Sequence, residues 1–333
     1  MKTVSINVSN LCVPCENRCR YCLLSWGGKL RGVEYDRSAA YARRFYEWLK
    51  ENRPELGFGF YFGYSMEHPK LLENIDFLRE IGSPGGEFLQ LDGMKFRNDR
   101  EILELLTGLQ YHGIGLINLT FYGTEKYHDR FAARQGDFDY LLRILKTANK
   151  IGLDVSAGIA LNHENSHQSG DLLAILQSYN LSRVFAFVPH GEGRGKNLES
   201  IRFRQSDYDA MPDSVKAVFN RSKFRPEMEW IRENNFTDPQ KRVITLNLTP
   251  DNMDTFEALG FDDTIAYLER LDDTYYSAVP SLPILINRYG DLRGECYYSE
   301  RDLFLKYQRR YISEECLNLH DVNDECTHFS RRF

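Results

Sequence analysis

The feature that most constrains the fold is a repeated alternation of strand-like and helix-like patterns over about the first 200 residues. Six short runs rich in β-branched, aromatic and other apolar residues are predicted as strands, at 4–8, 58–62, 87–91, 114–121, 153–161 and 184–188. In the five segments between them, apolar residues recur every three or four positions, as on the buried face of an amphipathic helix. Repeated units of this size predict parallel strands joined by helical crossovers. Periodicity alone fits an open doubly wound sheet and a partial barrel equally well.

The rest of the chain differs in character and predicts two further parts. Residues 199–242 are polar and are interrupted by three prolines, and 243–248 is a strand candidate. The last part contains the run 285–291, which we interpret as a strand that leads into a turn. We therefore divide the chain into a core at 1–200, a helical connector or cap at 201–280 and a C-terminal extension at 281–333.

Charge and hydropathy limit the binding partners and the cellular compartment that we expect for this protein. The net charge is −6 and the sequence pI is about 5.8, which makes nucleic acid an unlikely main partner. No apolar run approaches the roughly 18 residues that span a bilayer, and the first residues lack the apolar stretch of a secretory signal. We therefore expect a cytoplasmic protein with no membrane partner. In that compartment, seven cysteines indicate thiolate chemistry or metal binding rather than disulfides.

Three of these cysteines lie close together directly after the first predicted strand. Cys15, Cys19 and Cys22 are separated by three and then two residues, so a tight loop can turn three thiolates toward one face of an iron–sulfur cube. Zinc sites normally close with four ligands. Three thiolates on a [4Fe–4S] cluster leave one iron without a protein ligand, and that iron is where chemistry can occur. The alternatives are a zinc site or a redox-inert knuckle, and Cys12 is expected to be a small buried residue outside the motif.

The Cys-x3-Cys-x2-Cys spacing, with the aromatic Tyr21 before the third cysteine, resembles the signature of the radical S-adenosylmethionine (radical SAM) superfamily. The resemblance covers about residues 1–200 and implies an α/β fold, a partial (β/α)6 TIM-type barrel with a C-terminal extension. It also implies a [4Fe–4S] cluster on Cys15, Cys19 and Cys22 whose open iron is chelated by the amino and carboxylate groups of SAM. One electron would then cleave SAM to a 5′-deoxyadenosyl radical that takes a hydrogen atom from the substrate. An external electron donor such as flavodoxin or ferredoxin, and a contact of Tyr21 with the cofactor, are expected with it.

The resemblance assigns further cofactor contacts, each at the C-terminal end of a predicted strand, where barrels place their sites. The stretch after the second strand departs from the family's Gly-Gly-Glu. There, Gly63, Tyr64 and Ser65 are expected to contact the methionine moiety, or Glu67 is expected to do so after a shift. A literal Gly-Gly-Glu at 85–87 precedes the third strand and is interpreted as a turn.

The same resemblance assigns three more residues to the cofactor, two of them near its nucleoside. Thr120, after the fourth strand, is expected to bond the ribose, although the neighbouring Tyr122 stands where the family has an Asp. Asn162 ends the fifth strand and matches a family Asn near the nucleoside. Arg194 lies in a stretch that resembles the family's Pro-x-Gly-Arg-Gly-type loop.

The late cysteines leave three hypotheses open. The region from Leu285 to Cys296 loosely resembles the start of the SPASM or twitch extension of many family members, but no Cys-x2-Cys pair follows. In the first hypothesis, Cys296, Cys316 and Cys326 are plain thiols. In the second, they bind a possible auxiliary iron–sulfur cluster. In the third, one of them donates a hydrogen atom to a substrate radical. Cys296 is the candidate catalytic residue in the last case. We favour a single cluster, with the C-terminal region as a lid or substrate wall.

The sequence therefore predicts a radical SAM enzyme that acts on a peptide or a small natural product. A radical SAM enzyme that modifies RNA is the alternative within the class. An iron–sulfur electron carrier or sensor without SAM turnover is the alternative from another class. Whether the reaction is an epimerisation, a dehydrogenation, a bond formation or a rearrangement stays open, as does the substrate.

Overall fold

The chain forms a mixed α/β structure with parallel strands. The computed structural model describes residues 3–8, 15–22, 33–61, 66–82, 87–233 and 243–319. The strands are β1 (Thr3–Val8), β2 (Gly57–Tyr61), β3 (Phe88–Gln90), β4 (Leu116–Phe121), β5 (Asp154–Ala160), β6 (Arg183–Phe187), β7 (Arg225–Pro226), β8 (Val243–Leu248) and β9 (Tyr297–Tyr298). The first six coincide with the six predicted strands, so these strand predictions are confirmed.

Most strands belong to one of two parallel sheets, in the orders β2-β1-β8 and β3-β4-β5-β6. The longest ladder of the second sheet runs from Leu116↔Asp154 to Phe121↔Ile159. In the first sheet, Thr3 is the register partner of both Gly57 and Val243, so β1 has a parallel neighbour on each side. In the described part of the chain no ladder joins β2 to β3. Parallel βα architecture is thus present, and closure into one barrel stays a prediction.

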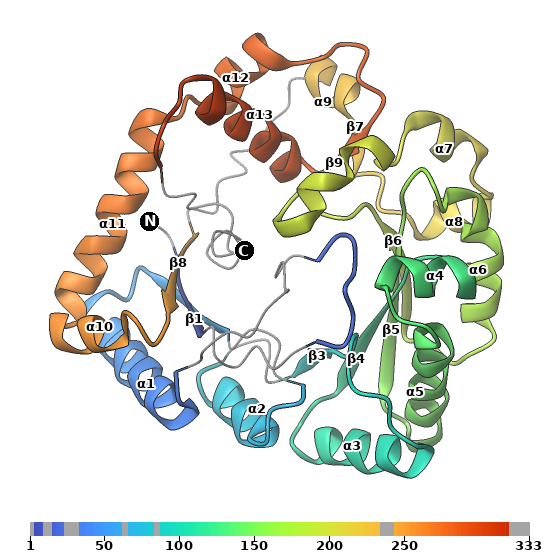
Figure 1. Ribbon diagram of the computed structural model, residues 1–333, viewed down its shortest axis with the longest axis horizontal. Coiled ribbons are helices and arrows are strands. Elements are labelled where there is room, and N and C mark those ends of the chain that lie inside the picture. Colours follow the sequence, from blue (N-terminus) through green and yellow to red (C-terminus); the bar gives the residue numbers. More distant parts are fainter. Residues whose placement is uncertain are drawn as a thin grey trace.

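Helices connect the strands and lie outside them (Figure 1). They are α1 (Tyr35–Asn52), α2 (Leu71–Glu80), α3 (Asp99–Tyr111), α4 (Glu125–Ala132), α5 (Asp137–Ile151), α6 (Ser169–Gln177), α7 (Gln205–Ala210), α8 (Asp213–Val218), α9 (Glu227–Glu233), α10 (Met253–Leu259), α11 (Phe261–Ala278), α12 (Leu282–Tyr289) and α13 (Glu300–Glu314), with 3-10 turns η3 (Ser166–Gln168) and η4 (Gly193–Ile201). None of the described helices is long and apolar enough to cross a membrane.

Two hydrophobic cores correspond to the two sheets. Around β3–β6, the fully buried Leu145 of α5 and Val155 of β5 belong to a core that also receives α2, α3 and α6. Around β1, β2 and β8, Phe45 of α1 lies in the same core as Leu303 of α13. The C-terminal helices therefore share a core with the N-terminal sheet, because each amphipathic helix must bury its apolar stripe against a neighbour.

One sequence prediction about this region is wrong. Residues 285–291, interpreted as a strand leading into a turn, lie largely in helix α12, which has a Pro at its first turn. Its buried side chains are Leu282, Leu285, Ile286 and Tyr289. That spacing is the helical i, i+3, i+4, i+7 pattern, and it outweighs the local β-propensity of the apolar run.

Candidate active site

The cysteine loop at 15–22 is fixed by backbone hydrogen bonds to two parts of the fold. The amides of Arg18 and Arg20 donate to the last two carbonyls of α4, at 2.7 and 3.2 Å. At the other end of the loop, the amide of Arg194 donates to the carbonyl of Cys22 at 3.0 Å. These bonds tie the loop to segments that follow β4 and β6, at the carboxyl ends of those strands. That edge is where parallel βα folds place ligands.

Gly93, in the turn after β3, lies against the sulfur of Cys15. Its carbonyl accepts a hydrogen bond from the Glu16 amide at 2.8 Å, and its φ of +74° is one that residues with a Cβ rarely adopt. A Cβ built at this position would lie 2.1 Å from Sγ of Cys15. Glycine is therefore required here, both for the turn and for the space that the thiol occupies.

A buried polar network holds the middle of the loop. Asn17 Nδ2 donates to Asp137 Oδ2 at 2.9 Å, and Arg134 contacts the other carboxylate oxygen at 3.1 Å. The Tyr122 amide donates to His128 Nδ1 at 3.2 Å, so Nε2 carries the proton and donates to Asp137 Oδ2 at 3.1 Å. His128 and Asp137 are fully buried. Because a buried charge is costly unless it is paired, this network strongly favours one position of Asn17.

The thiols sit in a desolvated aromatic environment. Sγ of Cys19 lies 3.3 Å from the hydroxyl of Tyr122, and the Tyr21 ring meets the Tyr122 ring edge-on at 5.5 Å. Burial raises the pKa of the Cys15 thiol to about 12, and it raises the pKa of Cys19 as well. A metal that binds these sulfurs would displace their protons, as metals do at thiolate sites.

Among the described residues, no three His, Cys, Asp or Glu side chains converge as ligands of a single metal ion. A [4Fe–4S] cube does not need that convergence, because its three thiolate ligands each bind a different iron. Two features are compatible with such a cluster: the space that Gly93 leaves for the Cys15 sulfur, and the fixed backbone of the loop.

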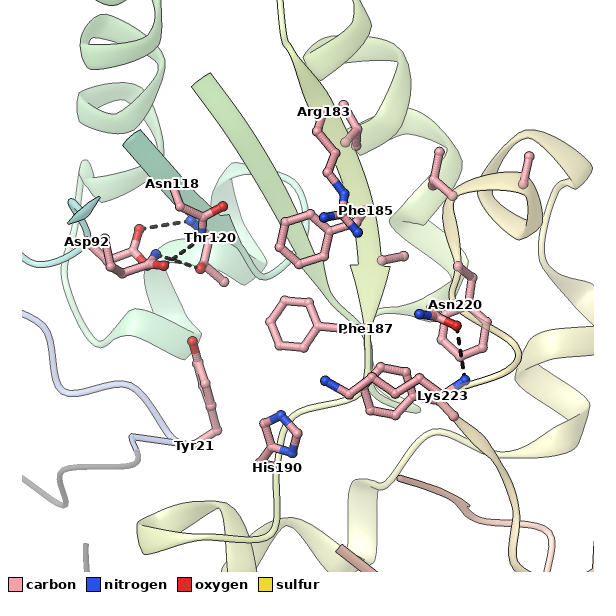
Figure 2. A pocket seen from close by; sticks show the side chains of 17 residues that line it. Tyr21, Asp92, Asn118, Thr120, Arg183, Phe185, Phe187, His190, Asn220 and Lys223 are labelled. Atoms are coloured by element: carbon pink, nitrogen blue, oxygen red, sulfur yellow. Dashed lines mark hydrogen bonds between the residues drawn. The ribbon is translucent and has the colours of Figure 1, made fainter. Parts of the chain in front are cut away.

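A cavity of about 740 Å³ lies beside this loop and is walled by β3, β4, β6 and residues 217–224. Figure 2 shows Asp92 and Thr120 on one side, Phe185 and Phe187 on the other, and Tyr21 of the cysteine loop at the edge. The Asp92 carboxylate accepts a hydrogen bond from the Thr120 amide at 2.9 Å, and burial raises the pKa of Asp92 to about 7. The volume is in the range of small-molecule sites.

The sequence profile of the Radical SAM superfamily matches residues 10–174, which include the cysteine loop and β2 to β5. Residues 10–174 belong to the radical SAM superfamily. No curated protein sequence matches the chain.

Solved structures of other proteins resemble the fold at low sequence identity. A structure of Streptococcus suis SuiB bound to the precursor peptide SuiA shares 13% identity over 57% of this chain and 40% of that chain, with a TM-score of 0.42. Escherichia coli coproporphyrinogen III oxidase (HemN), a radical SAM enzyme, shares 14% identity over 74% of this chain and 63% of that chain, with a TM-score of 0.43. The structure of anSMEcpe with bound AdoMet shares 15% identity over 56% of this chain and 51% of that chain, with a TM-score of 0.39. The chain thus spans about half the length of these proteins.

The structure brings several of the residues assigned to SAM to the edge that carries the cysteine loop. Thr120 lines the cavity, and the Arg194 backbone holds Cys22. The side-chain Oδ1 of Asn162 accepts a hydrogen bond from the Tyr127 hydroxyl at 3.0 Å, whereas its buried Nδ2 has no hydrogen-bond partner among the described residues. A buried amide donor left open at a strand end fits an adenosine ligand of the radical SAM type.

The structure gives less information on the residues assigned to the methionine moiety of SAM. Gly63, Tyr64 and Ser65 lie outside the described residues. The Glu67 carboxylate is buried and bound to Arg97 at 2.7 Å and to the Lys95 amide at 2.8 Å. The carboxylate of Glu67 thus already has partners, and its contact with SAM stays a prediction.

The two late cysteines that the structure describes, Cys296 and Cys316, do not line the cavity. Cys296 is half-buried, its backbone is bridged to Arg204, and it is not among the cavity-lining residues. Cys316 is exposed after α13, and Cys326 lies outside the described residues. Helix α13 contributes about 22 Å of length between Cys296 and Cys316. The auxiliary cluster and the hydrogen-donor role of Cys296 stay hypotheses.

Sequence reasoning missed three residues that shape the site: Gly93, Tyr122 as a neighbour of Cys19, and Asp137. Gly93 did carry a signal, since Asp-Gly directly follows the third predicted strand. Asp137 carried none, because it reaches Asn17 over a sequence separation of 120 residues.

Proposed function

We propose that the protein is a radical SAM enzyme that cleaves S-adenosylmethionine reductively and takes a hydrogen atom from a peptide or small natural product. One observation supports this most: the loop of Cys15, Cys19 and Cys22 is fixed at the carboxyl edge of parallel strands, beside a cavity that has both polar and aromatic walls. Cytoplasmic location and reduction by an external donor such as flavodoxin or ferredoxin belong to the proposal.

The residues present fit the proposed cofactors. A [4Fe–4S] cluster bound by the three thiolates would supply the electron that cleaves the sulfur–carbon bond of SAM. Tyr21 and Tyr122 would exclude water from that side of the loop, because their rings pack against each other and the Tyr122 hydroxyl contacts the Cys19 sulfur. Thr120 and the open Nδ2 of Asn162 would orient the nucleoside.

The cavity favours an enzyme over an electron carrier. A carrier needs a cluster near the surface but no enclosed ligand space, whereas this chain has a walled volume next to the loop. The net charge of −6 disfavours RNA as substrate, since an RNA-modifying enzyme usually presents a basic face.

The test is anaerobic reconstitution followed by single-turnover and multiple-turnover assays with dithionite. We expect about four irons per chain and slow release of 5′-deoxyadenosine without substrate. Cys15→Ala, Cys19→Ala and Cys22→Ala should each abolish that release. Cys316→Ala is the matched control, because that thiol is exposed and distant in sequence from the loop.

Three results would contradict the proposal. They are zinc in place of iron, full activity in any of the three loop variants, or S-adenosylhomocysteine as the sole nucleoside product. A protein that holds four irons and never cleaves SAM would be an electron carrier or sensor.

A further inference from the structure

The β3 and β4 side of the cavity presents hydrogen-bond acceptors. Asn118 is 6% exposed, and its Nδ2 donates to Gln90 Oε1 at 2.5 Å. Gln90 in turn donates to Thr120 Oγ1 at 3.0 Å and to the Asp92 carboxylate. This chain of bonds fixes the orientation of the Asn118 amide. Its Oδ1 is buried and accepts no hydrogen bond from any described residue, so Asn118, which lines the cavity, keeps one acceptor unsatisfied.

The opposite side presents the ammonium group of Lys223 and the imidazole ring of His190. Lys223 Nζ lies 5.3 Å from the centroid of the Phe224 ring, and the His190 ring lies 6.3 Å from the same ring. All three residues line the cavity. In the described part of the chain, Lys223 forms no ion pair with a carboxylate. A cation at a cavity wall without a protein counter-ion is a ready partner for an anionic ligand.

His190 is oriented by the C-terminal extension. Its Nδ1 bonds the Asp302 carboxylate at 3.0 Å, while the other Asp302 oxygen accepts from the Gly191 amide at 2.8 Å. Burial opposes the charge of Asp302, yet His190 and Arg202 lower the pKa of this carboxyl below its usual range. Because Nδ1 is occupied, Nε2 is the ring nitrogen available to a ligand.

Aromatic rings form the surface between the two polar sides. Phe185 and Phe187 extend from β6 into the cavity (Figure 2) with ring centroids 5.7 Å apart. A Cβ at Gly158 of the neighbouring strand would lie 3.0 Å from the Phe185 ring. Glycine at this position thus leaves room for the two rings to lie over β5 and to offer an apolar face.

We infer that this cavity binds the substrate through an amino-acid unit. The carboxylate faces Lys223 and His190, an N–H group donates to Asn118 Oδ1, and the apolar body lies against Phe185 and Phe187. The inference rests on the proposed function, since it names the substrate class of that same site. A free amino acid and the C-terminal residue of a peptide share this chemistry.

The test measures binding to the reconstituted holoenzyme in saturating SAM, by anaerobic isothermal titration. L-Phenylalanine represents a free amino acid, N-acetyl-L-phenylalanine represents a peptide C-terminus, and N-acetyl-L-phenylalaninamide is the neutral isostere. For ligands of this size we expect a Kd of about 1 mM. At least one acid should bind about fivefold to tenfold more tightly than the amide, and the better acid identifies the source.

Lys223→Met should reduce that preference to near parity. Lys216→Met is the matched control, because its ammonium faces Asp213 at 3.8 Å and the residue does not line the cavity. It should keep the preference for the acid.

Four results would overturn the inference: equal binding of acid and amide, an unchanged preference in Lys223→Met, failure of all three probes to bind, or binding only when SAM is absent. The last result would assign the cavity to the methionine moiety of SAM itself. The readout needs no turnover, so failure to bind in an enzyme that still releases 5′-deoxyadenosine refutes this inference alone. Failure to cleave SAM refutes the proposed function.

Discussion

Replacing Gly93 by alanine should prevent cluster binding while leaving the fold intact. The new Cβ would lie 2.1 Å from Sγ of Cys15, whereas non-bonded heavy atoms settle at about 3.5–4.0 Å. The sulfur would therefore have to move by about 1.5 Å. Metal sites tolerate deviations of only about 0.2 Å in ligand distance, so Cys15 could not stay a ligand without a rearrangement of the loop.

The backbone contribution to this effect can be separated with a matched control. Gly152, which caps α5, has a similar φ of +69°, but a Cβ there would meet nothing within 4 Å. Alanine in the left-handed region costs about 1–2 kcal/mol at either position. With an unfolding entropy of about 2.1 cal/mol/K per residue, each kcal/mol corresponds to about 1.5 °C in Tm for a chain of this length.

Iron content and thermal unfolding, both measured anaerobically, distinguish the two effects. Gly152→Ala should lower Tm by about 1.5–3 °C and keep the wild-type iron content. Gly93→Ala should remain folded but hold little iron and release no 5′-deoxyadenosine. A Gly93→Ala protein with the full iron content and normal SAM cleavage would refute the argument that this glycine makes room for a ligand sulfur.

Three further variants test other contacts. Asn17→Ala leaves one bond of the buried Asp137 carboxylate unmade, so it should lower the free energy of unfolding by about 1–3 kcal/mol and lower iron retention; urea unfolding and iron assays with no change in either would contradict this. Because the pKa of Asp92 is raised to about 7 in the folded chain, the free energy of unfolding of the apoprotein should fall as the pH rises from about 4 to 7. Urea unfolding at a series of pH values should show this fall, and Asp92→Asn should make it smaller. An equal fall in Asp92→Asn would show that the pKa of Asp92 is not raised. Gly158→Val should narrow the cavity at the Phe185 ring and weaken N-acetyl-L-phenylalanine binding at least threefold, and equal binding would place the ligand elsewhere.

The strands were predictable from local patterns, and their partners were not. The six runs in the first 200 residues are found as β1 to β6 because buried parallel strands are short and almost continuously apolar. The segment 243–248 was a strand candidate, yet nothing local shows that it pairs with β1, some 240 residues away. The strand predicted within 285–291 is helix α12, and the helical spacing of Leu282, Leu285 and Ile286 was visible in the sequence.

The candidate site also has one part that could be predicted from the sequence and one part that could not. The spacing of Cys15, Cys19 and Cys22 is a local pattern, so the motif and its chemistry can be inferred from the residues. The side chains that hold the loop are brought together by tertiary packing: Asp137 reaches Asn17 and Tyr122 reaches Cys19. Their residue types do not reveal that role, since buried Tyr residues, and buried Asp residues that have a partner, also occur in ordinary cores.

The position of β1 between β2 and β8 has a consequence for biosynthesis. β1 is made first, but its second neighbour begins at Val243. At typical elongation rates of about 5–20 residues per second, one edge of β1 waits roughly 12–50 s for β8. An unpaired strand edge is a template for pairing with other chains. The nascent protein should therefore depend on chaperones during that interval, and any truncation before β8 should aggregate rather than fold as a smaller domain.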